Sequence, residues 1–170
     1  MTAAAASANA GPPTRVLGFD YGTRRIGMAF GQRVTGTATA LAVVPNGAAG
    51  PAWASIEAAL REWAPDALVV GLPLALDGTE QPMTAQARGF ARRLAERYRL
   101  PVHAHDERMS SIEAARRFAT ARRAGVVRAR AADTLDSVAA QVIVESFLAA
   151  SGAATTAAAA TPQPCLTPMT

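Results

Sequence analysis

The order of apolar segments along this chain constrains its fold more than any other feature. Three short runs rich in apolar and β-branched residues follow one another near the N-terminus, at residues 16–20, 26–31 and 36–44. Glycine-containing turns separate them, which predicts three successive antiparallel strands joined by hairpins. Helical and strand patterns then alternate to the end of the apolar region. This order predicts an α/β domain built on a mixed sheet.

The second half of the domain alternates between helices and strands. Helices are indicated by apolar residues at three- and four-residue spacing, or by start signals such as a proline in the first turn or a capping box. Strands are indicated by short apolar runs bounded by turn residues. The predicted helices span residues 53–63, 82–99, 110–121 and 133–149, and the predicted strands between them span residues 67–71 and 102–105.

The two ends of the chain differ in composition from the middle. Residues 1–14 consist largely of Ala, Ser, Gly and Pro, and residues 151–170 largely of Ala, Thr and Pro. Such segments cannot bury enough large side chains to offset the entropy cost of ordering them. We therefore expect one domain at residues 15–150, flanked by two disordered tails.

The charged residues indicate a phosphate-bearing partner. All 17 basic residues are arginine and the net charge is +4. A guanidinium binds phosphate oxygens through paired hydrogen bonds, which favours nucleic acid, although a GC-rich genome would also favour arginine. Cys165 has no partner for a disulfide within the chain, and no signal peptide or membrane-spanning run is visible. These features predict a cytoplasmic protein that does not enter a membrane.

Three acidic residues lie at the ends of predicted elements. Asp20 ends the first strand, Glu107 follows the last strand, and Asp136 lies near the start of the last helix. If the two strands end at the same edge of the sheet, the three carboxylates can converge there. Convergent carboxylates repel one another unless they share cations, and Mg²⁺ favours few carboxylates, several waters and phosphate oxygens. The three acids are therefore candidate ligands for metal ions that promote phosphodiester hydrolysis.

The three acids belong to four short motifs. These are Gly-Phe-Asp-Tyr-Gly-x-x-Arg-Ile-Gly-x-Ala at residues 18–29, Val-Val-Gly-Leu-Pro at 69–73 with Asp77-Gly78 after it, Asp-Glu-Arg-x-Ser at 106–110, and Asp-Ser-x-Ala-Ala at 136–140. In this order and spacing they resemble the YqgF/RuvX family of bacterial RNase H-like proteins, over essentially residues 15–150. That family is described both as Holliday junction resolvases and as nucleases that process the 5′ end of pre-16S ribosomal RNA.

The resemblance implies a fold and a function. The fold is RNase H-like, with a central five-stranded mixed sheet whose first three strands are antiparallel and with helices on both faces. The function is metal-dependent nuclease activity with Mg²⁺ or Mn²⁺, in which the family's three acidic positions fall on Asp20, Glu107 and Asp136. The expected partners are pre-rRNA, branched DNA as an alternative, and ribosome-assembly intermediates, with the protein acting as a monomer or a homodimer.

Further candidate site residues surround the three acids. Glycines and a serine at element ends are candidates for the rim of the active site, and arginines near the acids or before the last helix are candidates for binding nucleic acid. Where the family often has threonine and lysine, this chain has serine at 110–111 and arginine before the last helix. The rim candidates are Gly22, Gly71 and Ser110, and the nucleic-acid-binding candidates are Arg25, Arg108, Arg122, Arg123, Arg128 and Arg130.

Each acidic candidate also has a structural interpretation. Asp20 could simply begin a turn, and Glu107 could pair with Arg108 or Arg25 to hold a loop. Asp136 could stabilise the N-terminal turn of a helix whose N-cap is Asp133.

Several other residues are better explained by packing than by binding. His103 and His105 share one face of a strand but are too few for a closed zinc site. The tryptophans at 53 and 63 are expected in the core or at an interface, not as platforms for base stacking. The arginine row on the second predicted helix, at 88, 92, 93, 97 and 99, is expected to be a solvated face.

Two other functions fit parts of the sequence. The turn at residues 20–23 also resembles the first phosphate-binding turn of the actin and sugar-kinase superfamily, but such proteins need a second similar domain to close over ATP. The arginines also fit a non-catalytic ribosome-assembly factor that binds pre-rRNA without cutting it. That factor would bind RNA in a salt-sensitive way with no metal-dependent cleavage.

Overall fold

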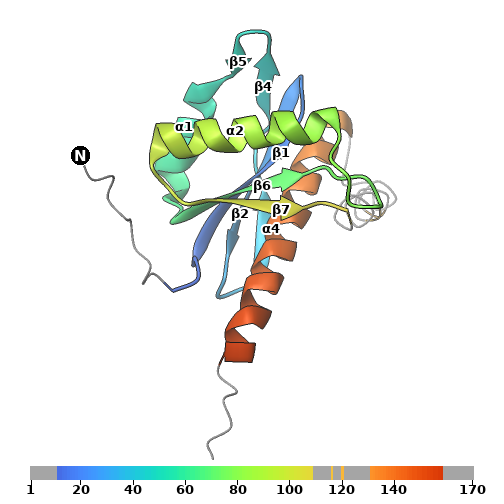
Figure 1. Ribbon diagram of the computed structural model, residues 1–170. Helices are drawn as coiled ribbons and strands as arrows, with labels where there is room; N and C mark the ends of the chain where they lie inside the picture. The colour runs from blue at the N-terminus through green and yellow to red at the C-terminus, as the bar shows by residue number, and fades with distance from the viewer. Residues whose placement is uncertain (1–10, 109–115, 117–119, 121–130, 159–170) are drawn as a thin grey trace, which may run out of the picture.

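The computed structural model describes residues 11–108, 116, 120 and 131–158 (Figure 1). Its strands are β1 (Arg15–Tyr21), β2 (Arg25–Gln32), β3 (Thr37–Ala40), β4 (Val44–Gly47), β5 (Gly50–Pro51), β6 (Ala67–Leu72) and β7 (Val102–Asp106). Its helices are α1 (Trp53–Trp63), α2 (Pro82–Tyr98) and α4 (Ala131–Ala158). The strands form one mixed sheet in the order β5-β4-β2-β1-β6-β7, and β3 also pairs with β2.

The first strands are antiparallel, as predicted, but the third is divided. β2 pairs with β1 along almost its whole length, and the opposite edge of β2 is long enough to pair with two short strands. β3 pairs with residues 29–32 of β2, whereas β4 pairs with Arg25 and Ile26. β4 also pairs with β5 in a hairpin, in which Gly50 of β5 adopts φ +94°. The sheet therefore has seven strands where five were predicted.

The strands that follow are parallel. β6 pairs in parallel with β1 on one side and with β7 on the other. All six residues of β6 are buried, as expected for a strand covered on both faces. The carboxyl ends of β1, β6 and β7 therefore lie at one edge of the sheet, which is the arrangement that convergence of Asp20 and Glu107 requires.

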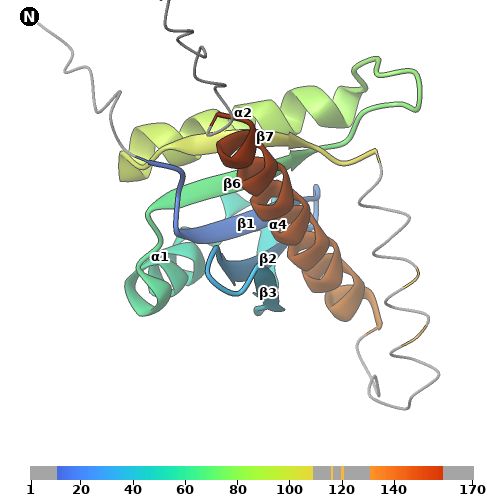
Figure 2. The same cartoon turned by 90° about the horizontal axis from the view of Figure 1, so that it is seen from below.

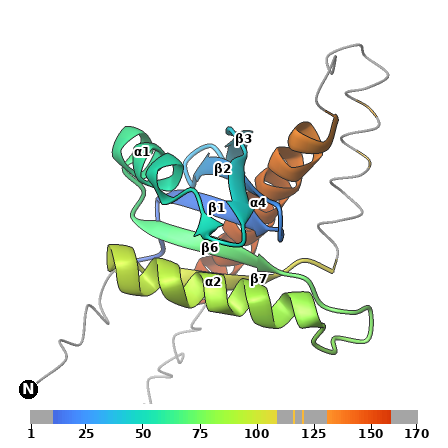
Figure 3. The same cartoon turned by 90° about the horizontal axis from the view of Figure 1, so that it is seen from above.

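Helices cover both faces of the sheet, as predicted (Figures 2 and 3). On one face, side chains of β1, β2 and β6 pack against Ile56 of α1 and against Phe90 and Leu94 of α2. On the other face, a smaller cluster joins the sheet to Ile143 and Val144 of α4. Two buried layers therefore hold the sheet between α1 and α2 on one side and α4 on the other.

The helix boundaries follow local sequence signals. Pro82 occupies the first turn of α2, and the Gln81 main-chain N–H donates to the Thr84 hydroxyl at 2.9 Å in a capping box. α1 ends at Ala64, which adopts a left-handed conformation before Pro65. In the described residues no helix has the length and apolar content to cross a membrane.

α4 is longer at both ends than predicted. It begins at Ala131, so Asp133 lies inside the helix and is not its N-cap. It also continues to Ala158, eight residues into the segment expected to be a tail, because alanine favours a helix and nothing there stops one. The helix predicted at 110–121 lies outside the described residues, except that Arg116 and Thr120 are helical.

Candidate active site

Asp20 lies between two glycines in the sheet. It pairs in register with Gly27 of β2. Phe19 pairs with Val70 of β6, so the same register continued by one residue places Gly71 on the other side of Asp20. Cross-strand neighbours direct their side chains to the same face of a sheet, so Asp20 has no side chain beside it on either neighbouring strand. Those two positions are open to other groups.

The groups above these glycines are the other two acidic residues. A Cβ atom on Gly27 would overlap with the main-chain oxygen of Asp136, and a Cβ atom on Gly71 would overlap with the carboxylate of Glu107. Asp136, Asp20 and Glu107 therefore form a row across the sheet, on the face that α4 covers. The structure brings together all three acids that the sequence singled out.

The Asp20 carboxyl is held in an unfavourable environment. Burial, and to a lesser extent the negative charge of Asp136, raise its pKa from 3.8 to about 6. Desolvation and a like charge both favour the neutral form of a carboxyl group. A cation bound beside Asp20 would offset both the desolvation and the repulsion by Asp136. A residue that only begins a turn would not need such a partner.

Glu107 is more strongly perturbed than Asp20. Its side chain is buried, with 8% of the residue exposed. Burial, followed by the negative charges of Asp20 and Asp106, raises its pKa from 4.5 to about 8. Its Oε1 atom is buried and accepts no hydrogen bond from any residue that the structure describes. A buried oxygen without a partner is costly, and a metal ion is one group that would satisfy it.

Asp136 is positioned by α4 and neutralised by Arg25. The Arg25 Nε atom lies 3.0 Å from the Asp136 Oδ2 atom, and both side chains are partly exposed.

The helix that carries Asp136 is fixed in rotation by two hydrogen bonds from α4 to main-chain carbonyls in and just after β3. Ser137 Oγ donates to the Leu41 carbonyl at 2.7 Å, and Gln141 Nε2 donates to the Ala38 carbonyl at 2.9 Å.

Neither expected arginine pairs with Glu107. Arg25 contacts Asp136, and Arg108 contacts Asp106, with its Nε atom 2.7 Å from the Asp106 Oδ2 atom. A second bond runs from the Arg108 main-chain N–H to Asp106 Oδ1 at 3.0 Å, so this pair closes the end of β7. Arg108 also lies beside Gly78 in the loop after β6. The pairing of Glu107 with Arg108 or Arg25 that its structural interpretation requires is therefore not formed.

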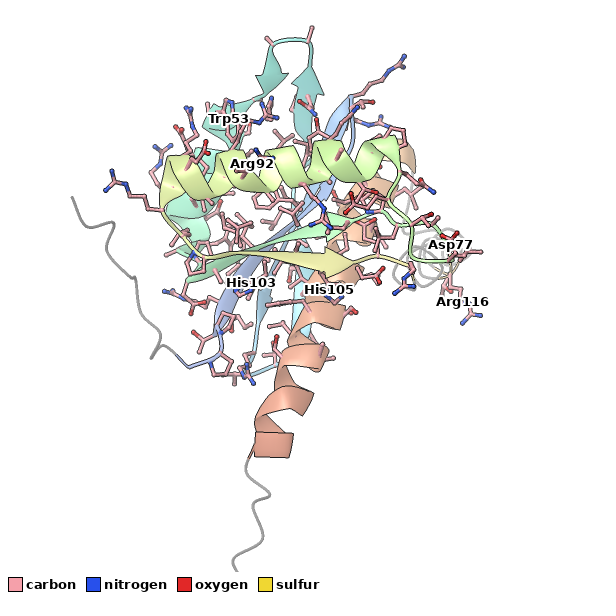
Figure 4. The ribbon with its side chains drawn as sticks, in the orientation of Figure 1. Trp53, Asp77, Arg92, His103, His105 and Arg116 are labelled. Carbon is pink, nitrogen blue, oxygen red and sulfur yellow. The ribbon has the colours of Figure 1, made fainter. Side chains whose placement is uncertain are left out.

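The rim candidates are only partly described. Gly22 lies in the turn between β1 and β2, where Asn46 Nδ2 donates to its carbonyl at 2.7 Å, and Gly71 lies under Glu107. Asp77 and Arg116 are exposed at the end of the molecule that holds this edge of the sheet (Figure 4). Ser110, Arg122, Arg123, Arg128 and Arg130 lie outside the described residues, so their roles stay predictions.

The three acids fit an open site for a hard cation. Their donors are carboxylate oxygens, which Mg²⁺ and Mn²⁺ favour, and one of those oxygens is buried without a partner. In the ion-free arrangement of the described residues, no three acidic, histidine or cysteine side chains lie close enough together to hold a metal ion, so a cation would have to draw the carboxylates together. His103 and His105 instead pack against Phe147, and His105 also hydrogen-bonds Ser146 at 2.9 Å. An ion here would keep part of its coordination for water and substrate.

We expect the ion-free protein to lose stability as the pH rises through the two raised pKa values. The folded pKa values of Asp20 and Glu107, about 6 and about 8, exceed the ordinary values of 3.8 and 4.5. Between pH 4 and 8 the folded state therefore holds more protons than the unfolded state, and the free energy of unfolding falls with increasing pH. Urea unfolding in chelator from pH 5 to 9 measures this slope.

The matched control for this prediction is the variant Asp20→Asn with Glu107→Gln. It should lose most of the decline between pH 6 and 9, because neither side chain titrates. Burial lowers the pKa of His105, which destabilises the protein at low pH and affects both proteins equally. An equal decline in the two proteins would contradict the raised pKa values.

The chain has close relatives among known proteins. Residues 14–150 match the family model described as RuvX, Holliday junction resolvase. A protein of Xanthomonas oryzae pv. oryzae (strain PXO99A) named "Putative pre-16S rRNA nuclease" is 52% identical over 144 residues, covering 85% of this chain and 93% of that protein. A protein of the same name from Xylella fastidiosa (strain M23) is 53% identical over 138 residues, covering 81% and 89%.

A solved structure supports the fold class. RuvC of T. thermophilus in complex with a Holliday junction substrate aligns with a TM-score of 0.51 at 21% identity, over 82% of this chain and 96% of that chain. At this identity the likeness concerns the fold alone. It confirms the predicted RNase H-like class.

Proposed function

This chain belongs to the RuvX family, and from that membership and the row of three carboxylates we propose that it is a metal-dependent endonuclease acting on structured RNA. The relatives that are about half identical to it are named for pre-16S rRNA, which favours the 5′ end of that precursor as the substrate. The family model is named for the Holliday junction, so a four-way DNA junction is the second substrate to test.

The observation that carries this proposal is the buried carboxylate of Glu107. Its Oε1 atom accepts no hydrogen bond among the described residues, and it lies in a row with Asp20 and Asp136 at one edge of the sheet. A protein that only binds RNA gains nothing from acidic groups buried at this edge, because they repel phosphate. Buried carboxylates that destabilise the free protein are typical of sites that a cation completes.

Asp20, Glu107 and Asp136 are the residues that would hold Mg²⁺ or Mn²⁺. When bound, the ion would supply an activated water and neutralise charge at the phosphodiester. In the ion-free protein Glu107 holds a proton near neutral pH, because burial and the neighbouring acids raise its pKa to about 8. That proton must leave before the carboxylate can bind a cation. Arg25 neutralises Asp136 and so weakens its repulsion of Asp20.

The direct test is cleavage of labelled substrates by the purified protein. Pre-16S rRNA and a four-way DNA junction are each incubated with Mg²⁺, Mn²⁺ or chelator, and the products are mapped. We expect RNA cleavage near the mature 5′ end with either ion and none in chelator. Symmetrical cutting of the junction would instead indicate resolvase activity, which we would expect from a two-fold dimer. Salt-sensitive binding of RNA without cleavage under any condition would overturn the nuclease proposal in favour of a non-catalytic assembly factor.

A further inference from the structure

A shallow, open groove runs along the exposed side of α2, on the face of the sheet opposite the three acids. It consists of two adjoining hollows of about 460 and 340 Å³ that share Arg93 and Glu96. One wall is α2, and at Arg93 the groove reaches Gly50 of β5. We call it the α2 groove, and its lining residues are Tyr21, Trp53, Gln86, Gly89, Arg92, Arg93, Glu96 and Arg97.

The α2 groove is positively charged. Three arginines line it against a single glutamate. Arg97 is paired with Glu57 at 3.3 Å, but Arg92 and Arg93 form no ion pair with any acid that the structure describes. Two guanidinium groups without acidic partners in one groove favour an anionic ligand.

Trp53 orients the guanidinium groups in the α2 groove. The Arg97 and Arg93 Cζ atoms lie 4.8 and 5.6 Å from the centre of its ring. Trp53 also stacks on Phe90, at 6.1 Å between ring centres and 26° between planes, so the ring is anchored to the core. A guanidinium held over an aromatic face keeps its N–H edges available for phosphate oxygens. Trp53 therefore acts as a support for arginine and not as a platform for bases.

Gly89 keeps the middle of the α2 groove open. Glycine is the least favourable helix-interior residue after proline. A Cβ atom at position 89 would meet no atom within 4 Å, so the packing of the protein itself does not require a glycine there. A ligand that approaches the backbone of α2 would require one.

The α2 groove begins beside the candidate active site. Tyr21 lines it, and Tyr21 follows Asp20 directly in β1. Successive residues of a strand point to opposite faces, so Asp20 faces α4 while the Tyr21 ring packs on Phe90 beneath α2, 5.2 Å away. A nucleic-acid strand that passes over the edge of the sheet at Asp20 would therefore enter the α2 groove directly beyond it.

We propose that the α2 groove binds the sugar–phosphate backbone of the nucleic-acid strand that flanks the cleaved bond. The proposal rests on the nuclease function in naming that strand as the ligand. An acidic protein could also contact the two arginines. The groove, however, begins at Tyr21, next to Asp20, and this position favours the strand that is bound at the candidate active site. Contact with the backbone gives affinity independent of base sequence and fixes the position of the strand.

The test compares two double variants in a binding assay with single-stranded RNA from the pre-16S 5′ region, in chelator. The groove variant is Arg92→Gln with Arg93→Gln. The control is Arg15→Gln with Arg61→Gln, which removes the same charge from two exposed positions outside the groove. We expect the groove variant to bind about 10- to 100-fold more weakly, with a salt slope of log K shallower by about 1.4, at about 0.7 for each phosphate contact. The control should remain close to the wild-type protein.

A third variant separates shape from charge. Gly89→Leu fills the groove with a good helix former, so we expect a higher thermal midpoint, weaker RNA binding and an unchanged salt slope. Equal affinities for the groove and control variants would overturn the proposal, including the case in which the groove binds an acidic protein. If the wild-type protein cleaves no substrate but the two double variants still differ, the nuclease function fails, while the binding of RNA backbone by the α2 groove stands. If it cleaves RNA and they do not differ, only the groove proposal fails.

Discussion

Asp20→Asn is expected to lower the rate of phosphodiester hydrolysis by about 1,000-fold or more while raising the thermal stability of the ion-free protein. The loss of activity follows from the central position of Asp20 in the row, since its neighbours in the sheet are the two glycines under Asp136 and Glu107. An amide at this position is a poor ligand for Mg²⁺ or Mn²⁺, and it carries no charge to hold a cation between the other two acids.

The gain in stability follows from the raised pKa of Asp20. Burial, and then the charge of Asp136, raise that pKa to about 6, so at pH 8 the folded protein contains a carboxylate that it disfavours. A shift of about two units corresponds to at most about 3 kcal/mol, and partial exposure to solvent reduces this to about 1–2 kcal/mol. Asparagine has nearly the same shape without the charge. In a chain of this size we expect the thermal midpoint to rise by about 3–6 °C.

Cleavage of pre-16S rRNA and thermal unfolding, both at pH 8, measure the two effects. Glu62→Gln is the control, because Glu62 is an exposed carboxylate on α1 outside the row, and it should change neither quantity. Saturating Mn²⁺ should raise the midpoint of the wild-type protein and leave that of Asp20→Asn almost unchanged. A variant that is inactive but also less stable would argue that Asp20 has a structural role and does not bind metal.

The fold was predictable because its signals are local. Short apolar runs identified the strands, and helical spacing with Pro82 and Pro65 located α1 and α2. The division of the third strand into β3 and β4 was not predictable, because it depends on how two short strands share the eight residues of β2. The extension of α4 to Ala158 was missed because alanine and threonine were interpreted by composition, without weighing the helix propensity of alanine.

The three acids were identifiable from sequence because each stands at the end of an element. What the sequence did not reveal is how they are brought together. Gly27 and Gly71 were visible in the motifs, but their function depends on register, which places one on each side of Asp20. The pairing of Arg25 with Asp136 likewise depends on the packing of α4 over β2.

The α2 groove was also hidden from sequence. The arginine row on α2 was interpreted as a solvated face, and for Arg88, which pairs with Glu80, that interpretation agrees with the structure. Arg92 and Arg93 are exposed as well, but Tyr21 and Trp53 lie beside them. Helical periodicity shows which residues share a face of a helix, but it does not show which other elements lie next to that face.

Two glycine substitutions should separate the packing of the row from its chemistry. A Cβ atom on Gly27 would overlap with main-chain atoms of Asp136, so Gly27→Ala must push α4 away from β2. We expect it to lower the free energy of unfolding by about 3 kcal/mol, because a helix backbone cannot move aside without losing contacts in the core beneath α4. Gly71→Ala would instead meet the ends of two side chains, Glu107 and Ile143, which can rotate. We expect it to cost only about 1 kcal/mol.

Gly71→Ala, which costs little stability, should nevertheless have a large effect on the cleavage rate. Gly71→Ala displaces the Glu107 carboxylate directly, and a displacement of about 1 Å in a catalytic group can lower the rate about 100-fold in a protein that is still folded. Gly47→Ala is the control, because Gly47 is exposed outside the row and the groove and its added methyl group would meet no atom, so it should change neither the free energy of unfolding nor the cleavage rate by much. Urea unfolding and RNA cleavage are measured for all three variants. If Gly71→Ala retained full activity, the Glu107 carboxylate would not need its place over Gly71, and its assignment as a metal ligand would fail.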